Sequence, residues 1–185
     1  MRFKGTILLT VVLILLGGYL LWFELPHEKK AGEAKERENR VLDVNDQNVT
    51  GLVFKSGNDE IELERHPDRP DQKWEVVRPI VGPANDGAAT EALSTISRLT
   101  FSRVVDEKPA DLKPYGLDTP EFSATVVINH TEVEQLQFGA NNPIGSEVYL
   151  KRRGDKRVLL VGAGVRASLK KPLKEWRRPQ IFSEH

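Results

Sequence analysis

The feature that most constrains this chain is an uncharged apolar run over residues 6–23, close to its beginning. As a helix its 18 residues span about 27 Å, close to the ~30 Å hydrocarbon core of a bilayer. A helix in lipid satisfies its backbone polar groups internally. Arg2 and Lys4 precede the run, and Tyr19 and Trp22 lie near its far end, where aromatic rings favour the headgroup level. The run predicts a single transmembrane helix that acts as a signal-anchor.

Two other interpretations of the run stay open. A cleaved signal peptide has an apolar core of about 7–15 residues and a small-residue site after it, but the nearest such site, residues 32–34, lies beyond Lys29 and Lys30. A buried core helix is disfavoured because the apolar residues surround the helix and leave no polar face. Lipid anchoring through cysteine is excluded because the chain has no cysteine.

The basic residues that flank the run predict its orientation. Arg2 and Lys4 abut the run directly, whereas Lys29 is the first cation beyond it, so the positive-inside rule favours an N-terminus in the cytoplasm. We therefore predict a single-pass protein of the inner (cytoplasmic) membrane, with residues 1–5 as a cytoplasmic tail. The C-terminal domain is then expected in the periplasm or another extracytoplasmic space.

Residues 24–44 form a charged segment between the run and the rest of the chain. Glu33 with Arg37, and Glu36 with Arg40, are pairs at i,i+4 in the favourable order for a helix. No apolar stripe is present to dock this helix on a domain. The segment predicts a solvated stalk, and a helix that binds a partner is the alternative.

Residues 45–182 predict one domain of the α+β class. Its fold is expected to be a mostly antiparallel β-sheet packed with two or three helices, because strand-like runs alternate with turn signals. In one of these runs Glu60, Glu62 and Glu64 alternate with apolar residues, which favours a solvated strand face over a cation site. The predicted strands cover residues 48–55, 59–64, 73–78, 101–105, 121–129, 132–139, 147–152 and 156–161.

Three helical segments are expected between or after these strands. A helix capped by Asn85 or Asp86 runs to about Leu99, with an apolar stripe along one side. A single helical turn covers residues 110–113 and ends at Gly116 in the left-handed conformation. A last helix begins near Val165 and is kinked by Pro172. The stripe of the first helix is Ala89, Ala92, Leu93, Ile96 and Leu99.

Several residues in this domain occur in a distinctive order along the chain. They are Trp74, Pro79, Pro83-Ala84, Tyr115-Gly116-Leu117-Asp118, Pro120, Gly139 and Val148-Tyr149. The set resembles an uncharacterised bacterial family, domain of unknown function 4340, over about residues 45–182. The resemblance implies a single-copy, membrane-anchored member, related to accessory proteins of export-type ABC transporters. It implies no catalytic residue. The candidate structural motif consists of Trp74, Tyr115, Gly116, Leu117, Asp118 and Pro120.

The sequence gives little support to an enzyme or to a cofactor. Residues 162–167 match the dinucleotide pattern GxGxxA, but the chain ends before a second parallel strand and its acidic residue could follow. The four histidines are scattered over the stalk, two loops and the terminus, with no metal-ligand spacing. We therefore expect no enzymatic activity, no cofactor and no metal.

The last part of the chain is strongly basic, although the whole chain has no net charge. Anionic lipid or glycan could bind there, and so could an acidic partner, including the acidic N-terminal half of another copy. Solvated charges paired within the fold are the plainer explanation. Nucleic acid is not expected, because aromatic residues are scarce among the cations. The candidate anion-binding or partner-binding residues are Arg152, Arg153, Arg166, Lys170, Lys171, Lys174, Arg177 and Arg178.

Taken together, the anchor, the stalk and a domain without a recognisable catalytic site predict a non-enzymatic accessory or scaffold protein that acts outside the cytoplasm. The resemblance implies a membrane complex as the partner, with an export-type ABC transporter as the expected one. The alternative is a module that binds an anionic envelope lipid or glycan through the basic end.

Overall fold

The structure, a computed structural model, describes Leu13 and residues 36–179. The chain divides into two compact units, residues 1–39 and residues 40–185. In the first unit residues 36–38 are helical. No helix within the described part of the chain is long and apolar enough to span a membrane. The predicted span over residues 6–23 lies outside the described residues apart from Leu13, as does the predicted stalk up to residue 35.

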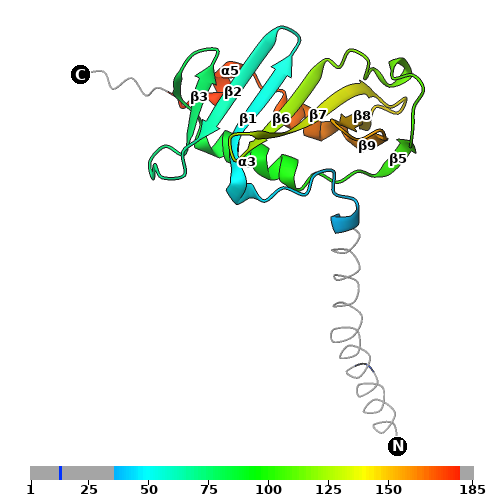
Figure 1. Cartoon of the computed structure of the whole chain (residues 1–185), viewed down its shortest axis with the longest axis horizontal. Coiled ribbons are helices and arrows are strands. Elements are labelled where there is room, and N and C mark those ends of the chain that lie inside the picture. Colours follow the sequence, from blue (N-terminus) through cyan, green and yellow to red (C-terminus); the bar gives the residue numbers. More distant parts are fainter. Residues whose placement is uncertain (1–12, 14–35, 180–185) are drawn as a thin grey trace, which may run out of the picture. The chain divides into compact units, whose positions relative to one another are not determined.

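Nine strands of the second unit form one sheet in the order β4-β3-β2-β1-β6-β7-β8-β9-β5 (Figure 1). Each neighbouring pair of strands is antiparallel. The predicted α+β class with a mostly antiparallel sheet is therefore confirmed. The strands are β1 (Val49–Ser56), β2 (Asp59–Arg65), β3 (Trp74–Arg78), β4 (Gly82–Pro83), β5 (Arg103–Asp106), β6 (Phe122–Ile128), β7 (Glu132–Asn141), β8 (Glu147–Arg152) and β9 (Val158–Gly162).

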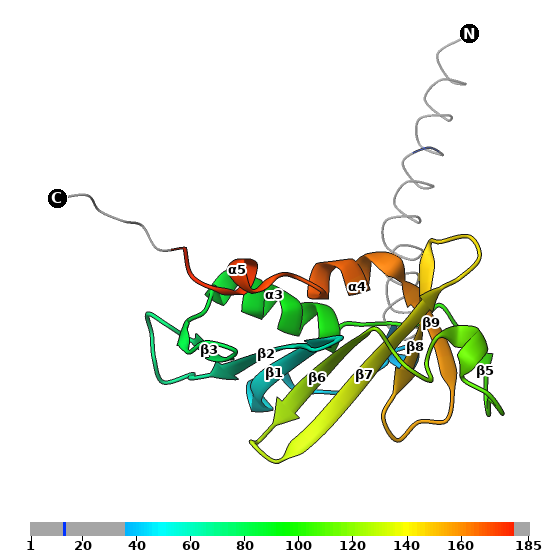
Figure 2. The same ribbon diagram turned by 90° about the horizontal axis from the view of Figure 1, so that it is seen from above.

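The α-helices of this unit lie along one face of the sheet (Figure 2). Helix α3 (Asp86–Ser97) carries the chain from β4 at one edge of the sheet to β5 at the other. Helices α4 (Ala163–Leu169) and α5 (Leu173–Trp176) follow the last strand and lie on the same face. In β2, Glu60, Glu62 and Glu64 are all partly exposed and Leu63 is buried, in agreement with the predicted alternation.

The main core lies between the sheet and these helices. Asn85 caps α3, its side-chain oxygen accepting a hydrogen bond from the Ala88 N–H at 3.2 Å. This cap and the apolar stripe on α3 confirm the predicted helix. The largest fully buried side chains of the core include Trp74 from β3 and Trp176 from α5. All five residues of the predicted stripe are buried: Ala89, Ala92, Leu93, Ile96 and Leu99.

A second, smaller apolar layer covers the opposite face of the sheet at β7 to β9. Leu117, Val158 and Leu160 are buried but lie outside the main core. Tyr149 of β8 is paired with Leu160 in the sheet, and its ring meets that of Tyr115 edge-on with centroids 5.1 Å apart. Strand β9 is therefore covered on both faces, which explains the continuous apolar run in its sequence.

Two helical predictions were wrong in detail. The short turn is a 3-10 helix, η3 (Lys113–Tyr115), rather than residues 110–113, because proline fits the first turn of a helix, where its missing N–H has no partner to lose. The last helix is not one kinked helix. Pro172 separates α4 from α5, because a proline inside a helix removes a hydrogen bond and clashes with the preceding turn.

Candidate functional site

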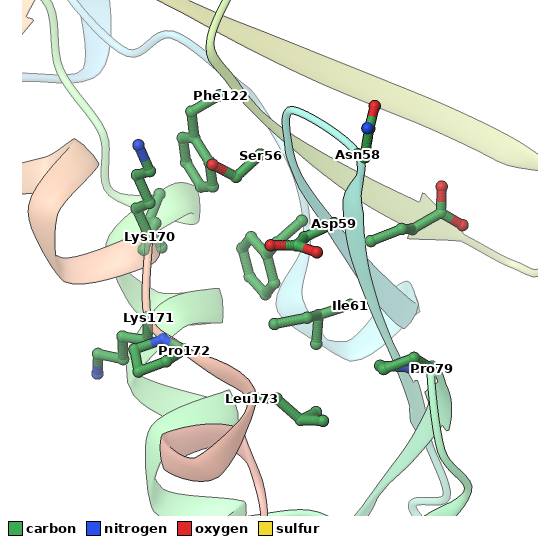
Figure 3. A pocket seen from close by; sticks show the side chains of 13 residues that line it. Ser56, Asn58, Asp59, Ile61, Pro79, Phe122, Lys170, Lys171, Pro172 and Leu173 are labelled. Atoms are coloured by element: carbon green, nitrogen blue, oxygen red, sulfur yellow. The ribbon is translucent and has the colours of Figure 1, made fainter.

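A groove of about 550 Å³ opens between the tip of the β1–β2 hairpin and the segment that joins α4 to α5 (Figure 3). Ile61 and Leu173 point into it from opposite walls. Of its thirteen lining residues, seven are aromatic, aliphatic or proline and six are polar or charged, so a partner could find both apolar contacts and charges there. The lining residues are Phe54, Ser56, Asn58, Asp59, Glu60, Ile61, Pro79, Phe122, Leu169, Lys170, Lys171, Pro172 and Leu173.

Stacked aromatic rings make the floor of the groove rigid. The ring of Phe54 is nearly parallel to that of Phe122, at 6.4 Å, and to that of Trp176 beneath it, at 4.6 Å. The Trp176 indole N–H donates to the backbone oxygen of Lys171 at 3.0 Å, which ties the α4–α5 segment to the floor. Burial of each of these three aromatic side chains stabilises the folded domain by about 2 kcal/mol. The floor of the groove is therefore part of the folded core and does not need a ligand to form.

The two walls of the groove carry opposite charges. The hairpin wall has Asp59 and Glu60, and the opposite wall has Lys170 and Lys171. Glu60 binds Lys55 at 2.7 Å, and this hydrogen bond is the main reason that its pKa is lowered. The Asp59 carboxylate has no hydrogen bond or ion pair to another described side chain, and it faces the groove.

The lysines of the other wall bind exposed carboxylates at its outer side. Lys170 pairs with Glu121, whose side chain is 70% exposed, and this hydrogen bond lowers the pKa of Glu121. The Lys171 ammonium points away from the groove to Glu91, at 3.1 Å. The Lys171 side chain is 19% exposed, and its ammonium also lies over the Trp176 ring, 5.6 Å from the centroid. The more exposed Lys170–Glu121 pair contributes about 0–1 kcal/mol, so Lys170 can exchange Glu121 for another charged partner at little cost.

An exposed apolar turn adjoins the groove. Pro79 lines the groove and follows a cis peptide bond, and the next two residues, Ile80 and Val81, are 57% and 66% exposed. The turn joins β3 to β4. The groove therefore continues into an apolar rim rather than ending in a polar one.

The eight candidate cations of the basic end do not form one free patch. Arg166, for example, donates to the Gly139 carbonyl and to Asn141 Oδ1, both at 2.7 Å. Arg178 donates to the Asp71 carbonyl at 2.7 Å. Arg152, Lys170 and Lys171 also have hydrogen-bond or ion-pair partners. Five of the eight cations are therefore bound within the fold. Within the described part of the chain, the side chains of Arg153, Lys174 and Arg177 have no such partner.

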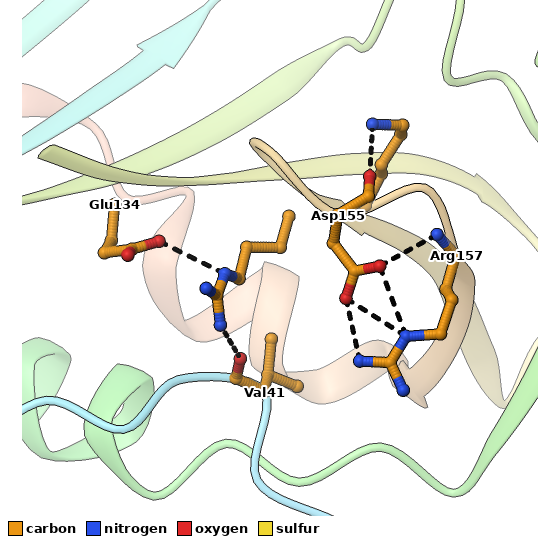
Figure 4. A network of polar contacts seen from close by, with 6 residues as sticks. Val41, Glu134, Asp155 and Arg157 are labelled. Atoms are coloured by element: carbon orange, nitrogen blue, oxygen red, sulfur yellow. Dashed lines mark hydrogen bonds and ion pairs between the residues drawn. The ribbon is translucent and has the colours of Figure 1, made fainter.

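The β8–β9 turn shows how such charges are used inside the fold (Figure 4). Arg157 Nη2 lies 2.8 Å from Asp155 Oδ2, and this pairing lowers the pKa of the Asp155 carboxyl and raises that of the Arg157 guanidinium. Arg152 Nε lies 3.2 Å from Glu134, and Arg152 Nη1 donates to the Val41 carbonyl at 3.4 Å. Arg157 therefore stabilises its own turn, and Arg152 joins β8 to β7 and to the segment that precedes β1.

The candidate structural motif has two parts. Trp74 is buried in the main core, and its backbone N–H donates to Asp86 Oδ1 at 2.9 Å, which joins β3 to the start of α3. The Tyr115 hydroxyl donates to Asp106 Oδ2 at 3.2 Å, which supplies the partner expected for a covered hydroxyl. Desolvation, and then this carboxylate, raises the pKa of Tyr115.

The second part of the motif packs on Gly139 of β7. Gly116 has φ +64°, the left-handed conformation predicted for it, and Leu117 is 2% exposed. A Cβ on Gly139 would lie 2.2 Å from the Tyr115 carbonyl oxygen and 2.9 Å from Leu117 Cγ. Only glycine lets the turn approach β7 this closely. Asp118 and Pro120 follow on the same loop, which leads into β6.

The other patterns in the sequence have structural explanations. Residues 162–167 form the junction of β9 and α4, and β9 is antiparallel to both of its neighbours, so no dinucleotide-binding βαβ unit is formed. Glu60 and Glu62 bind Arg78 at 3.1 and 3.2 Å. No group of three or more metal-ligating side chains occurs within the described residues.

The groove itself was missed in the sequence analysis. Phe54, Pro79, Phe122 and Leu173 come from four separate segments. Phe54 and Phe122 were assigned to predicted strands and Leu173 to the last predicted helix, and Pro79 entered only the set that carries the family resemblance. The one usable signal was the pair Ile80-Val81, two apolar residues between prolines in a segment expected to be a loop.

Comparison with known proteins identifies a family but no individual relative. No curated protein and no solved structure matches the chain. A family described as "Domain of unknown function (DUF4340)" matches residues 74–185, more than half of the chain. The match begins at Trp74, later than the expected start near residue 45, and it contains the motif residues up to Pro120 and Gly139. This chain therefore belongs to the DUF4340 family.

Proposed function

We propose that the protein is a membrane-anchored, non-enzymatic accessory or scaffold protein whose folded domain acts by binding, outside the cytoplasm. The partner we propose is a membrane complex, with an export-type ABC transporter as the first candidate, on the strength of the resemblance of the chain to accessory proteins of such transporters. The observation that carries the proposal is the order of an uncharged run, a charged segment and a single folded domain.

The groove supports binding as the activity of the domain. Its floor is an aromatic stack, and its walls offer apolar contacts together with charged groups of both signs. Such a surface stabilises a complex by removing apolar area from water, at about 25 cal/mol per Å². The adjoining apolar turn at Ile80 and Val81 extends the same kind of surface.

Membrane fractionation tests the anchor and its orientation. We expect the full chain in the membrane fraction, resistant to alkaline carbonate, and a variant without residues 6–23 in the soluble fraction. A phosphatase reporter fused after His185 is expected to be active outside the cytoplasm. Mature protein that begins beyond Glu24, or a reporter active only in the cytosol, would refute the proposed anchor.

Affinity purification from detergent-solubilised membranes tests the partner. We expect subunits of a membrane complex to co-purify with the full chain and to be lost with the variant without residues 6–23. If that variant retained the same partners and restored full function in cells lacking the protein, the anchored accessory role would be wrong.

The alternative proposal is binding of an anionic envelope lipid or glycan through the basic end. It now rests on fewer cations, because only Arg153, Lys174 and Arg177 among the candidates lack a partner within the described residues. Arg177→Glu and Lys174→Glu should then reduce sedimentation with vesicles that contain phosphatidylglycerol, and added salt should do the same. Binding that neither change affects would exclude this alternative.

A further inference from the structure

The groove and the apolar turn beside it are complementary features of one surface. The groove offers Ile61, Leu173 and an aromatic floor, and the turn offers Ile80 and Val81, which stand more than half exposed. Exposed apolar side chains that adjoin a groove are typical of an interaction surface, whereas a single one is common on any protein. Ile144, 86% exposed in a separate loop, is such a single residue.

A two-fold axis would bring the two features together. In a two-fold dimer the same patch of both copies forms the interface, so a projecting turn on one copy meets the groove of the other, and the reverse contact forms at the same time. The turn and the groove share Pro79, so both lie within one patch. With the axis along the groove, the turn of each copy lies over the Pro172–Leu173 wall of the other.

The charges of the two walls fit the same arrangement. An axis along the groove places the acidic hairpin wall of one copy against the basic wall of the other. Asp59 faces the groove and has no charged partner among the described residues, and Lys170 of the basic wall has one described partner, the exposed Glu121. A partner with the opposite arrangement of charges is therefore supplied by a second copy of this chain.

We propose that the groove binds a second copy of the chain, so that Ile80 and Val81 of each copy pack on Pro172 and Leu173 of the other, with Asp59 of one facing Lys170 of the other. This deepens the proposed function, because the accessory protein would then act as a pair. The two proposals remain separable, since self-association can be measured whether or not the chain is anchored.

Site-directed crosslinking tests the contact directly, because the full chain has no cysteine of its own. Two differently tagged full chains are co-expressed, one with Val81→Cys and one with Pro172→Cys, and treated with a short bis-maleimide in intact membranes. We expect a crosslinked pair that carries both tags. The matched control is Ile144→Cys with Pro172→Cys, and we expect no such product from it.

Charge exchange tests the orientation of the two copies. The full chain is purified in mild detergent, and its dimerisation is measured by sedimentation over a range of protein concentrations. Asp59→Lys and Lys170→Glu should each weaken dimerisation about ten-fold. The chain that carries both changes should return to within about two-fold of the unchanged one, because both contacts are then reversed together.

Apolar contact is tested by Ile80→Asp with Val81→Asp, which should weaken dimerisation about 100-fold, and Ile144→Asp should not change it. These side chains are exposed, so circular dichroism should stay unchanged.

A monomeric full chain, an equal effect of Ile144→Asp, or no recovery in the charge exchange would overturn the proposal. If the chain is monomeric and Ile80→Asp instead releases a co-purified membrane protein, the groove binds that protein, and the proposed accessory function stands.

Discussion

Replacement of Gly139 by alanine tests the most specific packing relation in the domain. The added Cβ would lie 2.2 Å from the Tyr115 carbonyl oxygen and 2.9 Å from Leu117 Cγ. Ordinary contacts between such atoms are more than 3 Å, so the turn at residues 115–117 must move away from β7 by about 1 Å. Tyr115 is then pulled from Tyr149, and Leu117 loses part of its burial.

The size of the effect follows from these two changes. Overpacking of a well-packed site costs about 1–3 kcal/mol, and partial exposure of a buried leucine adds about 1 kcal/mol. We therefore expect Gly139→Ala to lower the free energy of unfolding by about 2–4 kcal/mol. For a domain of this size that corresponds to a fall in Tm of about 5–15 °C.

Urea unfolding of the full chain in mild detergent measures this change. A Trp22→Phe background leaves the fluorescence of Trp74 and Trp176, which are both buried in the domain core. Gly164→Ala is the matched control, because nothing lies within 4 Å of a Cβ at that helical position. It should stabilise the domain by about 0.5–1 kcal/mol.

Coupling with Leu117→Ala adds a second criterion. Alone, this change should cost about 2–5 kcal/mol, and combined with Gly139→Ala it should cost less than the sum, because the turn has already moved. A Gly139→Ala protein within about 0.5 kcal/mol of the unchanged chain, or strict additivity, would refute the packing argument.

Three further predictions concern the rest of the domain. Trp176→Ala should lower the free energy of unfolding by about 3–5 kcal/mol, measured by urea unfolding, because it removes the support under Phe54. Asp86→Ala should cost about 1–2 kcal/mol and speed amide exchange at Trp74, since its carboxylate accepts that N–H. Asp155→Asn should cost about 0.5–1 kcal/mol at pH 7, as the Arg157 pairing is part-exposed. The Arg157 pairing lowers the pKa of Asp155 in the folded state. The difference in stability between the two proteins is therefore fully present above about pH 4, the pKa in the unfolded state, and is lost as the pH falls through the lower pKa of the folded state.

The sequence allowed most of the sheet to be predicted because its signals are local. Alternation in residues 59–64 and the turn at residues 56–58 define a hairpin without reference to the rest of the chain. The stripe on α3 is periodic over three turns, so its buried side was also predictable. Strand β4 has two residues, too few for any pattern.

The groove could not be predicted because its parts meet only after folding. Phe54 and Phe122 lie on adjacent strands, and Leu173 reaches them only because the chain breaks at Pro172. The basic end was misleading for a related reason. Arg166 is bound by a backbone carbonyl of β7 and a side chain beside it, and nothing in the sequence near Arg166 indicates that contact.

Apart from Pro79, which lines the groove, the residues that carry the family resemblance belong to the scaffold. Trp74 joins β3 to α3, and the turn at residues 115–117 fits against Gly139 on the face opposite the helices. The family match begins at Trp74, so it includes the groove wall at residues 169–173 but not the β1–β2 hairpin that forms the other wall. The family match therefore covers one wall of the groove, whereas the wall that carries Asp59 and Ile61 lies outside it.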